Sequence, residues 1–188
     1  MKCDVRKRMR EILSAMPPEA VARKSRLACQ AVAALEEFRS AEAIMTYLPI
    51  AGELNATAIA LAAWRLAKTV LVPKVNWRRR CMLAVEIDSL DDGLLAGRHG
   101  IPEPVRDAPW PADRIDLVIV PALAYDRTGA RLGRGGGFYD RFLAQAELRA
   151  VACGLAFDEQ VLAELPLQPH DRRVHMLVTD TEVLRFDG

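Results

Sequence analysis

The chain has 188 residues, of which 51% are hydrophobic and 27% are charged, and its formal net charge is +1. This length and composition fit a single globular domain over residues 1–188, with enough apolar side chains for a substantial core. The near-neutral charge disfavours a general nucleic-acid binder, since such proteins usually carry a basic excess. The four cysteines are far apart in the sequence, so neither a zinc site nor a disulfide scaffold is expected.

Targeting and membrane signals are also missing from the sequence. No apolar run approaches the length of a membrane span, and the first residues lack the apolar core of a signal peptide. We therefore expect a cytoplasmic protein that binds neither membrane nor nucleic acid. We also expect a monomer.

Two helices are predicted at the start of the chain. Apolar residues recur at helical spacing within residues 2–13, while Lys2, Arg6 and Arg10 share another face. Two consecutive prolines end this helix, and a second helix is predicted for residues 18–38. The basic face of the first helix is either a solvated surface or a surface that reaches a polyphosphate.

A buried strand is predicted for residues 43–49, and a helix for residues 57–67. Glu53 lies in the loop that connects them, at the carboxyl end of the strand. Ligand crevices of open α/β sheets lie at this edge. A single loop glutamate is usually exposed to solvent, and its place at this edge makes Glu53 a candidate site residue.

Two further strands are predicted for residues 69–73 and 81–87, joined by an arginine-rich turn at 76–80 that we expect to be a solvated loop. Residues 91–111 are rich in glycine and proline, which favours a long loop. Loops of this length are often functional or cover a site. His99 lies in this loop, but no partner that would make it a catalytic base is identifiable.

The strongest predicted strand, residues 116–123, is followed by a glycine-rich turn within residues 131–141 and a predicted helix at 138–148. Small residues let a phosphate approach the backbone, and successive N–H groups at a helix start favour negative charge. The arginines of this segment offer donors suited to phosphate oxygens. Asp140 is a candidate magnesium ligand, because that ion prefers oxygen donors.

This turn is neither of the two common glycine loops. It lacks the Gly-Lys-Ser/Thr end of a Walker A loop, and Phe138 stands where the dinucleotide fingerprint needs glycine. A glycine cluster alone is as often a flexible turn as a phosphate site. Arg131, Arg134 and the Tyr-Asp-Arg triplet at residues 139–141 favour the phosphate site.

The remaining elements are short. A central strand is predicted at 150–157, a short helix from residue 158, a turn at 169–171, a strand at 174–179 and an edge strand at 183–186. Strands and helices alternate along the chain, which predicts a layered α/β domain with a largely parallel sheet.

The segment Arg131-Leu132-Gly133-Arg134-Gly135-Gly136-Gly137-Phe138-Tyr139-Asp140-Arg141 resembles the nucleotide loop of the 5-formyltetrahydrofolate cyclo-ligase (methenyltetrahydrofolate synthetase) family. The flanking arginines and the Tyr-Asp-Arg triplet make this match more specific than a generic glycine loop. The resemblance runs nearly from end to end. It also includes Lys2, Arg6, Gly52-Glu53, Gly100-Ile101-Pro102-Glu103-Pro104, Phe157-Asp158-Glu159-Gln160 and Pro169-His170-Asp171.

The resemblance implies a three-layer α/β/α sandwich with a largely parallel or mixed central sheet. It also implies an activity: the cyclisation of 5-formyltetrahydrofolate to 5,10-methenyltetrahydrofolate, with ATP as co-substrate, Mg²⁺ as cofactor, and release of ADP and phosphate. In this reaction the formyl oxygen is phosphorylated to an imidate-like intermediate, which the folate nitrogen N10 attacks. The resemblance implies a folate substrate either with or without a polyglutamate tail.

Roles for individual residues follow from the resemblance. Arg134 and Tyr139 would be catalytic, and Asp140 and Asp171 would bind Mg²⁺. The nucleotide would contact Lys2, Arg6, Arg131, Leu132, Gly133, Arg134, Gly135, Gly136, Gly137, Phe138 and Tyr139. The folate would contact Leu48, Glu53, Arg134, Gly135, Gly136, Gly137 and Phe138.

Two positions depart from the family pattern. Gly136 stands where some relatives have lysine, and Phe138 stands where many have tyrosine. One alternative function is therefore a non-enzymatic module that binds folate or nucleotide. Another is a sugar-phosphate or acyl-CoA enzyme on a similar layered fold, because fold alone does not separate these activities.

Overall fold

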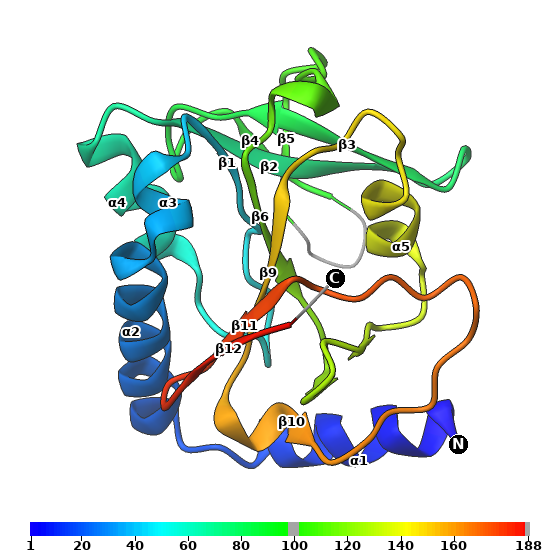
Figure 1. Ribbon diagram of the computed structural model, residues 1–188. Helices are drawn as coiled ribbons and strands as arrows, with labels where there is room; N and C mark the ends of the chain where they lie inside the picture. The colour runs from blue at the N-terminus through cyan, green and yellow to red at the C-terminus, as the bar shows by residue number, and fades with distance from the viewer. Residues whose placement is uncertain (98–101, 187–188) are drawn as a thin grey trace.

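The computed structural model describes residues 1–97 and 102–186 and shows one central sheet of seven strands (Figure 1). The strand order is β12-β11-β9-β6-β1-β2-β3. The bounds are β1 Ala43–Met45, β2 Thr69–Asn76, β3 Cys81–Glu86, β6 Leu117–Pro121, β9 Val151–Leu155, β11 Met176–Val178 and β12 Val183–Arg185. The inner neighbours pair in parallel, while β3 and β12 pair antiparallel at the two edges. The sheet is thus mixed and largely parallel, as expected.

Helices cover both faces of the sheet (Figure 1). They are α1 Lys2–Ser14, α2 Pro18–Ala34, α3 Glu36–Ser40, α4 Thr57–Arg65 and α5 Phe138–Leu143. Helices α2, α3 and α4 lie on one face and α5 on the other, while α1 runs past the end of the sheet beside β10 (Figure 1). This arrangement confirms the expected α/β/α layering. None of the helices described is long and apolar enough to cross a membrane.

The inner strands β1, β6, β9 and β11 are apolar because both of their faces are buried. Ile44 and Ile119 belong to the core on the side of α1 to α4, whereas Met45 and Val118 belong to the core on the side of α5. Side chains of successive strand residues point to opposite faces, so an uninterrupted apolar run fills two cores at once. This is the physical basis of the correct strand predictions.

Several elements differ from the sequence-based expectation. The helix expected over residues 18–38 is split into α2 and α3, because Leu35 has an extended backbone between them. The helix expected over 138–148 ends at Leu143, since the following residues form the return connection to β9. The expected turn after residue 123 contains paired strands instead.

The additional strands and 3-10 helices are all short. A three-stranded sheet consists of β7 Ala124–Asp126, β8 Arg131–Leu132 and β10 Val161–Leu162, and a hairpin consists of β4 Leu94–Ala96 and β5 Pro102–Pro104. The 3-10 helices are Ala112–Arg114 and Asp158–Gln160. The latter stands where a short helix was expected. His99 and residues 100–101 of the family resemblance lie outside the described residues.

The strand order places a switch point between β1 and β6. From β1 the chain adds β2 on one side, and from β6 it adds β9 and β11 on the other. Loops that follow the two central strands therefore diverge at the carboxyl edge, which is where α/β sheets form ligand crevices. The loop with Glu53 follows β1, and the glycine-rich segment follows β6 and β7.

Candidate active site

The glycine-rich segment begins buried and then reaches the surface. Arg131 and Leu132 are buried in β8, which pairs antiparallel with β7. Gly135 and Gly137 have φ angles of +111° and +64°, in a region that only glycine adopts at low cost. Helix α5 starts immediately afterwards at Phe138. The two glycines thus let the chain turn sharply between the buried strand and the helix.

Arg131 is fixed at the buried end of this segment. Its side chain is 3% exposed, and its Nη2 donates to Asp140 Oδ1 at 2.8 Å. The backbone N–H of Arg172 donates to the same oxygen at 3.1 Å. These bonds hold the Asp140 carboxylate at the start of α5. Arg131 Nε is buried, and no hydrogen-bond partner for it exists among the described residues.

Arg134 meets the loop that follows β1. Its Nε donates to Glu53 Oε1 at 2.9 Å, and the other oxygen of Glu53 accepts the Ile50 N–H at 3.3 Å. Leu48 is buried a few residues upstream, in the segment that follows β1. The structure therefore brings together an arginine expected to contact phosphate and a carboxylate expected to contact the folate, although 81 positions separate them.

Helix α1 directs its basic face at the same region. Arg6 Nε donates to the carbonyl oxygen of Gly133 at 2.9 Å, and Lys2 Nζ donates to Asp171 Oδ2 at 2.5 Å. Partial burial alone would raise the pKa of the Asp171 carboxyl. The hydrogen bonds from Lys2 and the Gln168 N–H outweigh that effect and hold this pKa below its ordinary value. Lys2 and Arg6 of this face thus contact Asp171 and the glycine segment, whereas Arg10 on the same face is exposed.

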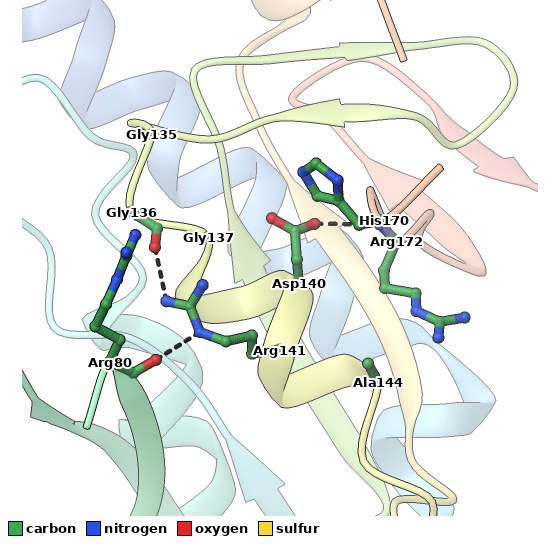
Figure 2. A pocket seen from close by; sticks show the side chains of 9 residues that line it. All are labelled: Arg80, Gly135, Gly136, Gly137, Asp140, Arg141, Ala144, His170 and Arg172. Atoms are coloured by element: carbon green, nitrogen blue, oxygen red, sulfur yellow. Dashed lines mark hydrogen bonds between the residues drawn. The ribbon is translucent and has the colours of Figure 1, made fainter. Parts of the chain in front are cut away.

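A cavity of about 420 Å³ opens beside the glycines (Figure 2). Its lining residues are Arg80, Gly135, Gly136, Gly137, Asp140, Arg141, Ala144, His170 and Arg172. The cations among them give the cavity a basic wall, which suits an anionic ligand. The cavity has a size typical of small-molecule sites.

Five lining residues were not among the predicted site residues: Arg80, Arg141, Ala144, His170 and Arg172. Arg80 lies in an exposed turn, as expected, and the β2–β3 hairpin also brings it to the cavity. Arg141 lies in the Tyr-Asp-Arg triplet and His170 in the Pro-His-Asp turn, so both stand beside residues that the sequence did indicate. No pattern in the sequence marked Arg172.

Tyr139 and Phe138 differ in their surroundings. The Tyr139 hydroxyl is buried, and the described residues offer it no hydrogen-bond partner. Burial, followed by the nearby charge of Glu53, raises the pKa of this hydroxyl well above its ordinary value, so the group stays protonated. The Phe138 ring is packed edge-on against Trp77, with 5.1 Å between ring centroids.

Of the expected magnesium ligands, Asp140 lines the cavity and Asp171 lies in sequence between two lining residues, and each is in an ion pair. Asp140 is paired with Arg131, and Asp171 with Lys2. Across residues 1–97 and 102–186, no group of three or more His, Cys, Asp and Glu side chains has the arrangement of a metal centre. Two carboxylates nevertheless suit Mg²⁺, which usually binds through one or two carboxylates together with substrate phosphates.

The chain thus combines a mixed, largely parallel α/β sheet with an arginine-lined cavity beside the glycine segment. The model of the family described as the 5-formyltetrahydrofolate cyclo-ligase family matches residues 1–180. The chain therefore belongs to the 5-formyltetrahydrofolate cyclo-ligase family, a family of ligase enzymes.

Individual relatives agree with this assignment. The chain is 38% identical over 138 residues to a 5-formyltetrahydrofolate cyclo-ligase of Mycolicibacterium smegmatis, covering 70% of each chain. It is 33% identical over 147 residues to the Escherichia coli K12 protein of that name, covering 76% of this chain and 80% of the relative. The solved structure of Aquifex aeolicus 5,10-methenyltetrahydrofolate synthetase superimposes with a TM-score of 0.86 at 30% identity, covering 100% of this chain and 94% of that one.

Proposed function

We propose that the protein converts 5-formyltetrahydrofolate to 5,10-methenyltetrahydrofolate, with conversion of ATP to ADP and phosphate and with Mg²⁺ as cofactor. The observation that carries this proposal is the Arg134–Glu53 contact. It joins the segment suited to phosphate with a carboxylate suited to the N–H-rich edge of a pterin. Family membership supports the choice of substrate.

The reaction must turn a poor leaving group into a good one. The formyl oxygen attacks the γ-phosphorus of ATP, an O–P bond forms, and the bond from the γ-phosphorus to ADP breaks. The resulting imidate-like phosphate is attacked at the formyl carbon by N10. The N10 proton is lost, the C–O bond breaks, and phosphate departs with the former formyl oxygen.

The side chains of the site serve alignment and charge neutralisation rather than covalent catalysis. Arg134 is 39% exposed at its side chain, so a ligand can reach its guanidinium. We assign to it the stabilisation of the charge on the transferring phosphoryl group, an electrostatic role that needs a fixed donor. Lys2 and Arg6 would hold the ATP phosphates from α1, together with the backbone N–H groups of the glycine segment. The buried, protonated hydroxyl of Tyr139 would add a donor.

The folate would lie against the loop that follows β1. Glu53 accepts hydrogen bonds, and its side chain is 16% exposed beside Arg134. Leu48 supplies buried apolar surface near the pterin ring. Residues Arg134 to Phe138 would border both ligands, so that the formyl oxygen and the γ-phosphate meet there in line.

Asp140 and Asp171 would hold Mg²⁺. Each is fixed at one oxygen, Oδ1 of Asp140 by Arg131 and Oδ2 of Asp171 by Lys2, so two preoriented carboxylates are available. When bound, the ion would neutralise charge on the substrate phosphates. We also place the enzyme in the cytoplasm as a monomer, acting on folates with or without a polyglutamate tail.

The direct test is to mix purified protein with 5-formyltetrahydrofolate, ATP and Mg²⁺ and to follow methenyltetrahydrofolate by its absorbance. We expect one ADP for each methenyltetrahydrofolate, and no product when ATP or the metal is omitted. Absence of product over a range of pH values and divalent metals would overturn the proposal. Calorimetric binding of the folate without ADP formation would favour a non-enzymatic binding module instead.

A further inference from the structure

One side chain joins the glycine segment to the β2–β3 hairpin. Arg141 Nη2 donates to the carbonyl oxygen of Gly136 at 2.7 Å, and Arg141 Nε donates to the carbonyl oxygen of Arg80 at 2.5 Å. Gly136 lies at the centre of the glycine segment, whereas Arg80 directly precedes β3. Figure 2 shows the guanidinium between these two backbones. Because both acceptors are main-chain oxygens, the contact acts on the path of each backbone.

A second contact connects the same two segments. The guanidinium carbon of Arg141 lies 5.2 Å from the centroid of the Phe138 ring. The Phe138 ring also packs against Trp77 in an edge-on arrangement, with an interplanar angle of 80°. Trp77 lies in the turn between β2 and β3. The hairpin therefore contacts the start of α5 through both a hydrogen bond and an aromatic pair.

The glycines of the segment fit closely against these side chains. A methyl group added at Gly136 would lie 2.7 Å from the Phe138 ring, and one added at Gly137 would lie 2.9 Å from Arg141 Nη1. Both distances are shorter than side-chain packing tolerates without movement. The backbone of Gly136 therefore packs closely against the Phe138 ring, and that of Gly137 against the Arg141 guanidinium.

We propose that Arg141 is a positioning residue that fixes the Gly136 peptide and seats the glycine segment on the β2–β3 hairpin, whose tip completes the wall of the ligand pocket. The expected effect of Arg141 on turnover rests on the proposed function, whereas its effect on the structure of the segment does not. The planar fork of an arginine presents Nε and Nη2 in fixed geometry toward two acceptors, which a lysine ammonium does not reproduce. Arg80 lines the cavity as well, so a displaced hairpin would alter the pocket.

The kinetic test compares Arg141→Lys and Arg141→Gln with Arg79→Gln, a control that removes one exposed positive charge from the same hairpin. We expect kcat to fall about 10²-fold in both Arg141 variants, because misplacement of aligned groups is costly even when it is small. We expect KM for ATP to change much less, and Arg79→Gln to stay within about twofold of wild type. Near-wild-type kcat in Arg141→Lys would overturn the proposal, since charge alone would then suffice.

A structural readout needs no substrate. In a Trp64→Phe, Trp110→Phe background, Trp77 is the one remaining tryptophan and reports on its packing against Phe138. We expect Arg141→Lys to increase acrylamide quenching of Trp77 about twofold while Arg79→Gln leaves it unchanged. Unchanged quenching in Arg141→Lys would contradict the proposal, and this variant also serves if Arg141→Gln does not fold. An inactive wild-type protein would overturn the proposed function, and the quenching comparison would still decide the role of Arg141 in the loop.

Discussion

The beginning and the centre of the glycine-rich segment are built differently. At its beginning, Arg131 and Leu132 are buried in a short strand, and the Arg131 guanidinium is held by Asp140. At its centre, Arg134, Gly135 and Gly136 are exposed. Arg134 contacts Glu53 from the surface of the protein, with a side chain that is 39% exposed.

This difference separates anchoring from ligand binding. The Arg131–Asp140 pair depends on both partners, because Arg131 is only 3% exposed and removal of Asp140 would leave its buried charge without compensation. An exposed ion pair contributes little to stability and is readily exchanged for contacts with a ligand. The buried end should therefore contribute more to folding stability than the exposed centre does, in addition to the role of Asp140 as a proposed Mg²⁺ ligand.

The largest effect is expected from Asp140→Ala, which leaves the buried guanidinium of Arg131 unpaired. We expect the free energy of unfolding to fall by about 3–5 kcal/mol, measured by urea denaturation. The control is Asp113→Ala, at an exposed position in a 3-10 helix. A loss below about 1 kcal/mol would mean that the buried end does not depend on this pair.

Arg134→Ala tests the exposed centre of the segment. We expect kcat to fall about 10²- to 10³-fold, the usual cost of removing a donor that stabilises transition-state charge. The free energy of unfolding should change by less than about 1 kcal/mol, because the Arg134–Glu53 pair is exposed on one side. Steady-state kinetics and urea denaturation on the same sample decide between these outcomes. Wild-type kinetics would remove Arg134 from the catalytic machinery.

A smaller effect is expected at Gly136, where a methyl group would contact the Phe138 ring at 2.7 Å. Gly136→Ala should cost about 1–3 kcal/mol of stability from overpacking. In a Phe138→Ala background the same change should cost less than about 0.5 kcal/mol, because the opposing ring is gone. Thermal or urea unfolding of the four proteins forms a double-mutant cycle. Equal costs in both backgrounds would show that the two family departures are not coupled through this contact.

The smallest effect concerns Lys2 and Asp171, at the end of α1. The lowered pKa of Asp171 means that its ion pair stabilises the folded state above the ordinary carboxyl pKa. This contribution is lost as the pH falls through the lower, folded-state pKa. Lys2→Met should therefore cost about 1 kcal/mol at neutral pH and nothing in strong acid, measured by urea denaturation with EDTA present. A difference that persists at the lowest pH would contradict this assignment.

The sequence predicted the central sheet well because strands buried on both faces appear as continuous apolar runs, such as residues 117–120. It could not predict β7, β8 and β10, since strands of two or three residues are stabilised by tertiary pairing and carry no periodic pattern. Leu35 likewise interrupts a helix without a local signal from proline or glycine.

For the candidate site, too, local chemical patterns were predictable and tertiary contacts were not. The glycines and arginines of residues 131–141 marked a phosphate site on chemical grounds. The approach of Glu53 to Arg134 was expected only through resemblance to a family, because folding sets a contact between loops that follow different strands. Arg80 lies in an exposed hairpin turn, as expected, but its place beside the cavity depends on how the β2–β3 hairpin packs near α5, which is a tertiary property.

The central claim is that the formyl oxygen of the folate and the γ-phosphate of ATP meet at the exposed centre of the glycine segment. The most direct measurement uses 5-formyltetrahydrofolate labelled with ¹⁸O in the formyl group, followed by mass analysis of the phosphate released. Direct phosphorylation of that oxygen requires one ¹⁸O atom in each phosphate. Unlabelled phosphate alongside labelled water would contradict the claim, because the formyl oxygen would then never have been bonded to phosphorus.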